Sequence, residues 1–280
     1  MNFMPVRQIE HAKAQRAVGQ LALGFQREPD APTRIKTFYQ QGCLKARLPR
    51  SVVHGTCEAV LMNISGGVAG GDVLTTSITL QPGAQVLVAT QAAERIYRAL
   101  NAVPAQITTS IRLEAGASLD YLPQETIFFD GFVLNRRMEI DLAPDAAFLA
   151  VESFVYGRQA MGEQVHEGRL RDAIRLRRNG VLQLAEMTRL DGDIAATLQR
   201  KSVGDGRMAM ASLIYAAPNA AARLAPLRAA LDGHMAGASI VEGILRARLL
   251  APTAASLRNA VIAAIAVCRD GRALPRVWQG

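Results

Sequence analysis

The amino-acid sequence predicts a mainly β protein: an elongated, layered structure of helically stacked strands with about two C-terminal α-helices. The main observation behind this prediction is a strand–turn–strand pattern that recurs about every 30 residues in the central part of the chain. A second observation is the helical spacing of apolar side chains in two stretches near the C-terminus. Together these patterns indicate one 280-residue domain, with stacked β repeats over about 75–190 and a β/α cover over about 205–280.

The chain before the repeats supplies further strands. Residues 16–25 and 73–80 alternate between apolar and polar side chains, which is the period of a strand with one buried face. Residues 33–39 and 43–48 are short strand candidates, and the apolar run 59–64 has the length of a buried strand. We therefore expect an N-terminal group of strands that continues directly into the repeats.

A glycine-rich loop follows the apolar run. It contains Gly66, Gly67, Gly70 and Gly71 and is closed by Asp72. Glycine permits positive φ, so one interpretation is a tight turn between strands, and the other is a phosphate-binding loop of a small-molecule enzyme. A phosphate loop is followed by a helix whose amide groups bind the anion, whereas a strand follows here. The pattern favours the turn.

The repeat consists of an alternating strand that ends in leucine, a small turn and a second strand. Its copies occupy residues 75–90, 108–123 and 137–152, with a weaker copy at 171–186, and the marker leucines are Leu80, Leu113, Leu142 and Leu176. A unit of this kind cannot bury its apolar face alone, so successive units stack and share one core. The repeat therefore predicts a long body in which equivalent residues of successive copies are aligned.

The C-terminal cover combines strands and helices. The predicted elements are strands at 207–216 and 238–250, a helix at 218–232 that stops at Gly233, and a helix at 253–268 that is capped by Thr253. The second helix carries an apolar stripe, and the single tryptophan, Trp278, anchors the tail. We expect this part to pack on the repeats rather than to form a separate catalytic domain.

The composition limits the possible cellular compartment and the class of protein. Half of the residues are hydrophobic, which is enough for a sizeable core. Cys43, Cys57 and Cys268 form no CxxC pair, which argues against a disulfide framework. No apolar run has the length of a membrane span, and the first residues lack the pattern of a signal peptide. We expect a cytoplasmic protein without a membrane partner.

The motifs of common enzymes and metal sites do not occur. The sequence has no GxSxG, HExxH, DFG or Walker pattern. Its four histidines are scattered without the spacing of metal ligands, so we do not expect a tight preformed metal site. A hydrolase assignment therefore has no specific support in the sequence, and we expect no tightly bound cofactor.

The net charge of +8 permits acidic partners, including nucleic acid. The densest basic run, residues 169–178, has alternating apolar side chains and is typical of a strand with a solvated basic face. Aromatic residues make up only 5% of the chain, and no nucleic-acid-binding module is recognisable. A basic, β-rich nucleic-acid-binding protein is the alternative function, although we predict no nucleic-acid partner.

The repeat also aligns two glutamates. The residues ten positions after the marker leucines are Thr90, Pro123, Glu152 and Glu186, with Glu94 and Glu125 just beyond this column. Carboxylates in neighbouring layers can line a polar channel or bind a hard or borderline cation. The alternative is that the two glutamates of the column are exposed strand ends paired with nearby arginines such as Arg158 and Arg189. The pattern alone leaves both interpretations open.

Several stretches, taken in order, resemble one family. They are NISGGVAGGD at 63–72, PGA at 82–84, TQAAERIYR at 90–98, LPQETIFFDG at 122–131, GRQAMGE at 157–163 and LPRVW at 274–278. This set resembles the urease accessory protein family UreD, also called UreH, from about residue 40 to the end. The chain departs from many relatives at Ala99, where they have Ser, and at Glu152, where they have Asp. It also has Val155 to Arg158 where they have Cys-Leu-Gly-Arg, which weakens the idea of a thiolate ligand there.

The resemblance implies a role in urease maturation rather than catalysis. Proteins of the family join UreF and the GTPase UreG on apo-urease and assist nickel delivery, and a dimer formed through the UreF complex is compatible with this role. The family fold is a layered, helically arranged β structure with two helices, and a polar internal tunnel is proposed as the nickel route. On this view nickel is in transit rather than tightly bound, and Glu152, Glu186 and Glu94 are the candidate residues along its path.

Overall fold

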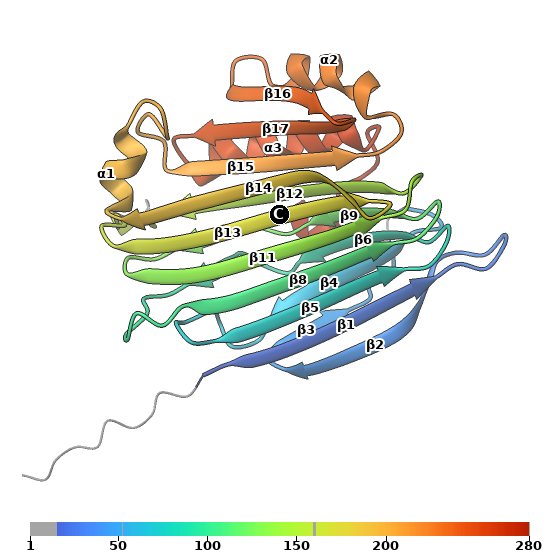
Figure 1. The fold of residues 1–280 in the computed structure, drawn as a ribbon, viewed down its shortest axis with the longest axis horizontal. Helices are drawn as coiled ribbons and strands as arrows, with labels where there is room; N and C mark the ends of the chain where they lie inside the picture. Colours follow the sequence, from blue (N-terminus) through green and yellow to red (C-terminus); the bar gives the residue numbers. More distant parts are fainter. Residues whose placement is uncertain (1–15, 52, 159–160, 280) are drawn as a thin grey trace, which may run out of the picture.

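The computed structural model describes residues 16–51, 53–158 and 161–279, and it contains two stacked β-sheets (Figure 1). The seven-stranded sheet has the order β14-β13-β11-β8-β5-β1-β2, and the other sheet runs β16-β17-β15-β12-β9-β6-β4-β3, with β7 and β10 off its path. The strands of the seven-stranded sheet are β1 (Val18–Gln26), β2 (Arg34–Gly42), β5 (Val73–Leu80), β8 (Ala105–Leu113), β11 (Phe132–Leu142), β13 (Gly168–Arg178) and β14 (Val181–Gly192).

The ten-stranded sheet and the helices complete the set of elements. The strands are β3 (Leu44–Arg47), β4 (Cys57–Asn63), β6 (Gln85–Thr90), β7 (Glu94–Ile96), β9 (Ser118–Leu122), β10 (Thr126–Phe128), β12 (Ala147–Tyr156), β15 (Ala209–Ala216), β16 (Met235–Val241) and β17 (Ile244–Ala251). The helices are α1 (Ile194–Gln199), α2 (Ala220–Ala230) and α3 (Ala254–Cys268), followed by a 3-10 turn at Arg276–Trp278. The mainly β, solenoid-like fold with helices near the C-terminus confirms the predicted fold class. No described helix combines the length and apolar character needed to cross a membrane.

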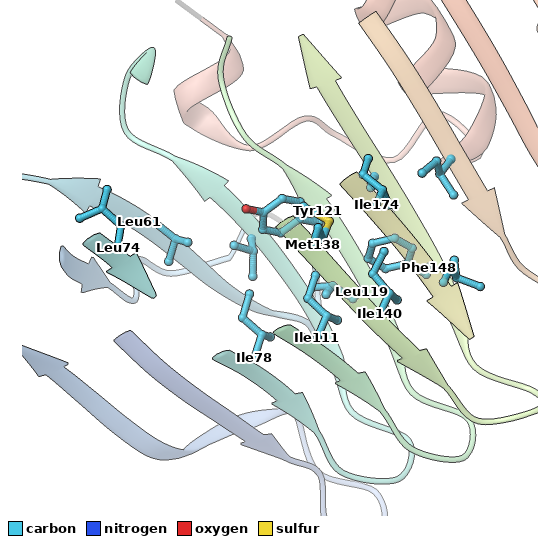
Figure 2. Close-up of a cluster of buried hydrophobic side chains, with 14 of the residues drawn as sticks. Leu61, Leu74, Ile78, Ile111, Leu119, Tyr121, Met138, Ile140, Phe148 and Ile174 are labelled. Atoms are coloured by element: carbon cyan, nitrogen blue, oxygen red, sulfur yellow. The ribbon is translucent and has the colours of Figure 1, made fainter. Parts of the chain in front are cut away.

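The first three repeat copies stack as predicted. Leu80 is paired with Leu113, and Leu113 with Leu142, in parallel strands of the seven-stranded sheet. After each marker leucine the chain turns a corner and enters the ten-stranded sheet, where β6, β9 and β12 are again parallel neighbours. The inward side chains of both sheets form one apolar core, part of which Figure 2 shows.

The fourth copy was predicted wrongly. Leu142 is paired with Arg178, so Leu176 lies two residues away from the expected register. The chain then does not cross to the other sheet but returns antiparallel as β14 in the same sheet. Asn179 and Gly180 have φ values of 50° and 77°, which is the geometry of a two-residue hairpin turn. This turn holds both strands in one sheet and ends the repeat.

The C-terminal elements pack on the outer face of the ten-stranded sheet. There α2, α3 and Trp278 form a second apolar cluster with β15 and β17. The side chain of Thr253 accepts a hydrogen bond from the amide of Ser256 at 3.1 Å and caps α3, as predicted. The single strand expected at 238–250 is instead a hairpin of β16 and β17, and α1 was not anticipated. The hairpin turns at Glu242-Gly243, where both residues have positive φ.

The glycine-rich loop is a close-packed turn between β4 and β5. The carboxylate of Asp72 accepts hydrogen bonds from the amides of Ala17 and Ala69, both at 2.8 Å, and closes the loop. At Gly67 φ is 147°, and a Cβ atom would lie 2.3 Å from Cε2 of Tyr97. The loop therefore needs glycine because of backbone conformation and close approach, in agreement with the turn interpretation.

Candidate functional site

A cavity of about 300 Å³ lies between the two sheets. Its walls include Asn63, Thr76, Glu94, Thr109, Tyr121 and Glu152. It reaches the surface beside Gly66, Gln91 and Ala92, which line it and are exposed. The cavity therefore connects the outside with the polar part of the interior.

Glu94 lies at the mouth of this cavity. It is the first residue of β7, and the side-chain amide of Asn63 lies 3.4 Å from both of its carboxylate oxygens. Burial raises the pKa of Glu94 to about 7 because it disfavours the charged form, and the hydrogen bond from Asn63 opposes this shift only in part. A carboxyl group with this pKa exchanges protons near neutral pH.

Arg136 lies at the inner end of the cavity between two carboxylates. Its Nε donates to Oδ1 of Asp172 at 2.8 Å, and its Nη2 contacts Oδ2 of Asp172 at 3.0 Å and also binds Glu152. The side chains of Arg136, Asp172 and Glu152 are only 12%, 6% and 6% exposed. The guanidinium carbon also lies 4.7 Å from the ring centroid of Phe154. The three side chains form a buried cluster in which one cation faces two carboxylates.

The excess of carboxylates over cations determines which groups of this cluster are charged. Burial raises the pKa of Glu152; Arg136 opposes the shift, while the charges of Asp172 and Glu186 reinforce it. Burial alone would lower the pKa of Arg136, but the carboxylates of Asp172 and Glu152 hold it above its ordinary value. Arg136 therefore stays positively charged, whereas burial shifts the protonation equilibrium of Glu152 toward the neutral form.

Glu186 continues the polar line beyond this cluster. Its Oε1 accepts a hydrogen bond from Oγ of Ser212 at 2.9 Å and from Nη2 of Arg248 at 2.7 Å, and Arg246 binds Oε2. Glu186 is 6% exposed, whereas the side chain of Arg248 is 58% exposed. Ser212 is the strand partner of both Glu152 and Arg248, so these three residues form a row across the ten-stranded sheet. We call the line from Glu94 through Glu152, Arg136, Asp172, Ser212 and Glu186 to Arg248 the polar band.

The predicted column is correct in part. Gln85, Ser118 and Ala147 are register partners, so Thr90, Pro123 and Glu152, each five residues further on, occupy equivalent positions. Glu186 does not belong to this column, because the Asn179-Gly180 hairpin keeps β14 in the opposite sheet.

The alternative of exposed glutamates paired with Arg158 and Arg189 is also wrong. Glu152 and Glu186 are both buried and bind other arginines. Arg158 binds Glu163 at 2.7 Å, and Arg189 lies 3.8 Å from Asp191. The two glutamates nevertheless approach each other from opposite sheets, since Ser212, the strand partner of Glu152, donates to Glu186.

Sequence reasoning missed the partners of the glutamates. These are Arg136, Asp172, Ser212, Arg246 and Arg248. A detectable signal existed for two of them. Arg136 lies in phase with the inward Leu134 and Met138, and Asp172 lies between the inward Leu170 and Ile174. A charged residue in phase with the apolar side of a strand is expected to be buried with a partner.

The band offers oxygen ligands to a cation but no closed metal site. Among the described residues, no three or more histidine, cysteine, aspartate or glutamate side chains are grouped to hold a metal ion. Carboxylate and hydroxyl oxygens suit hard or borderline divalent cations, and few such ligands bind them weakly. Arg136 further reduces the affinity at Glu152, since the guanidinium competes for the carboxylate.

Comparison with known proteins yields one consistent result. The family described as "UreD urease accessory protein" matches residues 17–279. The urease accessory protein UreD of Rhizobium rhizogenes is 44% identical over 266 residues, covering 95% of this chain and 96% of the relative. Its counterpart in Rhizobium leguminosarum bv. viciae is 45% identical over 249 residues, covering 89% and 90%. Another, from Methylobacterium sp. (strain 4-46), is 44% identical over 274 residues, covering 95% and 96%.

Proposed function

This chain belongs to the UreD family of urease accessory proteins, and we propose that it serves urease maturation as a non-catalytic scaffold that passes nickel toward the urease active site along the polar band. The nickel ion is cargo in this proposal, not a resident cofactor. The observation that carries the proposal is the continuity of the polar band. It starts at the surface cavity beside Glu94, passes between the sheets and ends at the exposed Arg248.

The chemistry of the band supports transit rather than storage. An ion that moves through a protein must bind strongly enough to enter and weakly enough to leave. Glu94 and Glu152 offer single carboxylates separated by polar side chains, and Arg136 competes with the cation at Glu152. Such contacts favour short residence of a partly hydrated divalent ion. Protonation of Glu94 near neutral pH would further help release at the mouth.

The proposal includes partners and a compartment. We propose that the chain joins UreF and UreG on apo-urease, with dimerisation through UreF, and that it works in the cytoplasm. Neighbouring proteins would supply nickel at one end of the band and receive it at the other. The curated relatives are named urease accessory proteins, which supports the assignment to urease maturation.

The test replaces both carboxylates of the band while keeping their shape. We expect the double variant Glu152→Gln/Glu186→Gln, expressed in a cell that lacks the native chain, to lower the nickel content and activity of purified urease severalfold. The matched control is Glu167→Gln/Glu242→Gln, which removes the same charge from two exposed positions. Circular dichroism and co-purification with UreF check folding and assembly. Full nickel loading of urease by the first double variant would remove these carboxylates from the path.

A further inference from the structure

The outer face of the seven-stranded sheet is open and rich in arginine. No helix lies in front of this sheet in Figure 1, since α2 and α3 pack on the other sheet. The outward positions of its strands β8, β11, β13 and β14 carry seven arginines: Arg112, Arg137, Arg169, Arg171, Arg175, Arg177 and Arg189. We call this surface the arginine face. None of its arginines belongs to the polar band, whose members on these strands, Arg136, Asp172 and Glu186, lie on the inner side.

Acidic residues neutralise this face only in part. Glu139 accepts hydrogen bonds from Arg137, Arg177 and Arg175 at 2.5, 2.7 and 3.3 Å. Asp191 lies 3.7 Å from Arg169 and 3.8 Å from Arg189, and Asp141 is the third acidic residue on this surface. Arg112 and Arg171 have no ion-pair partner within the described part of the chain. Seven arginines against three carboxylates leave an excess of positive charge on this face.

An exposed methionine lies among these arginines. Met187 is 74% exposed, and its strand neighbour Ala173 is itself paired with Arg137. The four strands contain no lysine. Arginine and methionine are enriched in protein–protein interfaces and lysine is depleted there. The composition of the face is therefore that of an interface rather than that of an ordinary solvated surface.

We propose that the arginine face is the surface on which this chain docks an acidic patch of apo-urease. This inference rests on the proposed function for the identity of the partner, and on charge complementarity for its chemistry. A protein fits better than a nucleic acid for two reasons. Carboxylates interleaved with the arginines repel a phosphate backbone, and the face presents no aromatic side chain on which a base can stack. An acidic protein surface can place its own basic groups opposite Glu139 and Asp191.

The geometry also explains why docking at this face leaves the path of the ion free. Arg136 and Arg137 are adjacent in β11 but point to opposite sides of the sheet, one into the polar band and one into the arginine face. A partner that contacts only the outward side chains of these strands therefore does not contact Arg136 or the cavity between the sheets. On this proposal the partner docks on the outer face of the seven-stranded sheet, and nickel passes between the two sheets.

The test reverses charge at two arginines that are strand partners, Arg171 and Arg189. Neither binds a residue of the polar band. The variant Arg171→Glu/Arg189→Glu is compared with Arg50→Glu/Arg276→Glu, which changes the net charge equally at two exposed positions away from this face. The association rate with purified apo-urease of the same organism is measured by surface plasmon resonance at about 0.05 M and about 0.5 M salt. Melting temperatures confirm that both variants are folded.

We expect the first variant to associate at least about tenfold more slowly at low salt, with most of the difference lost at high salt, and the control to stay within about twofold of the native chain. Equal rates for the native chain and the first variant, an equal loss in the control, or no binding of the native chain to apo-urease would each overturn the proposal. If the first variant loses binding to a DNA duplex but binds apo-urease as fast as the native chain, the arginine face binds nucleic acid and the proposal is wrong. Urease activation in the complemented cell tests the proposed function separately. If Arg171→Glu/Arg189→Glu leaves both docking and urease activation unchanged, the arginine face is rejected as the docking surface but the proposed function is not.

Discussion

The substitution Arg136→Met tests the central cluster of the polar band. Methionine keeps much of the length of the arginine stem, but it removes the cation that Glu152 and Asp172 share. Both carboxylates are only 6% exposed, so water compensates for the lost charge only in part. Removing one partner of a buried ion pair costs about 3–5 kcal/mol. Because two carboxylates lose their partner here, we expect a loss in the free energy of unfolding toward the upper end of this range.

The assay is equilibrium unfolding in urea, followed by the fluorescence of the buried Trp278. The control is Arg137→Met, the same change at the next residue. Arg137 lies on the outer face, its side chain is 56% exposed and it binds Glu139. A surface ion pair of this kind contributes about 1 kcal/mol or less. A triple variant, Arg136→Met/Glu152→Gln/Asp172→Asn, should recover at least about 2 kcal/mol, because it removes the unpaired charges themselves.

The pH dependence adds a second criterion. Burial raises the pKa of Glu152 and Arg136 opposes this shift, so without Arg136 the folded-state pKa of Glu152 lies further above its unfolded-state value and folding favours the protonated form. The penalty is then absent at low pH and grows as pH rises from the unfolded to the folded pKa values. We expect Arg136→Met to be much less destabilising at about pH 5 than at about pH 8. A cost equal to that of Arg137→Met at both pH values would refute the account of a buried charge cluster.

Two further predictions concern the mouth of the cavity and the glycine-rich loop. The pKa of Glu94 is raised from 4.5 to about 7, so the cost of burying its charge grows as pH rises from 4.5 and is complete above about 7. Glu94→Gln should therefore raise the free energy of unfolding by up to about 3 kcal/mol at pH 8 and have little effect at about pH 4. A gain that does not depend on pH would contradict this. Gly67→Ala should cost about 3 kcal/mol, because the added Cβ would lie 2.3 Å from Tyr97, whereas Gly66→Ala, with positive φ but nothing within 4 Å, should cost about 1 kcal/mol. Equal melting temperatures for these two alanine variants would show that the loop rearranges without strain.

The buried charges show how far the candidate site could be predicted. Glu152 was found from its distance to a marker leucine, and Arg136 and Asp172 were detectable from their phase in otherwise apolar strands. Glu186 was assigned to the wrong sheet because the turn after β13 was treated as another corner. The residues at that turn, Asn179 and Gly180, are the typical pair of a two-residue hairpin, so the sequence contained the information that distinguishes the two connections.

The sequence alone determined the features that depend on neighbouring residues. Alternation of apolar side chains defined the strands, because each strand exposes successive side chains on opposite faces. The recurrence of a marker leucine at the end of each strand, at Leu80, Leu113 and Leu142, defined the stacked register. The tertiary structure decided which charges meet. Arg136 and Asp172 are 36 residues apart, and Arg248 and Glu186 are 62 apart, so no local pattern specifies these pairs. Arg136 and Asp172 meet because they are register partners in the neighbouring strands β11 and β13 of one sheet. Glu186 and Arg248 meet because the chain folds into two sheets that lie face to face. Burial then requires each carboxylate to have a cation as partner.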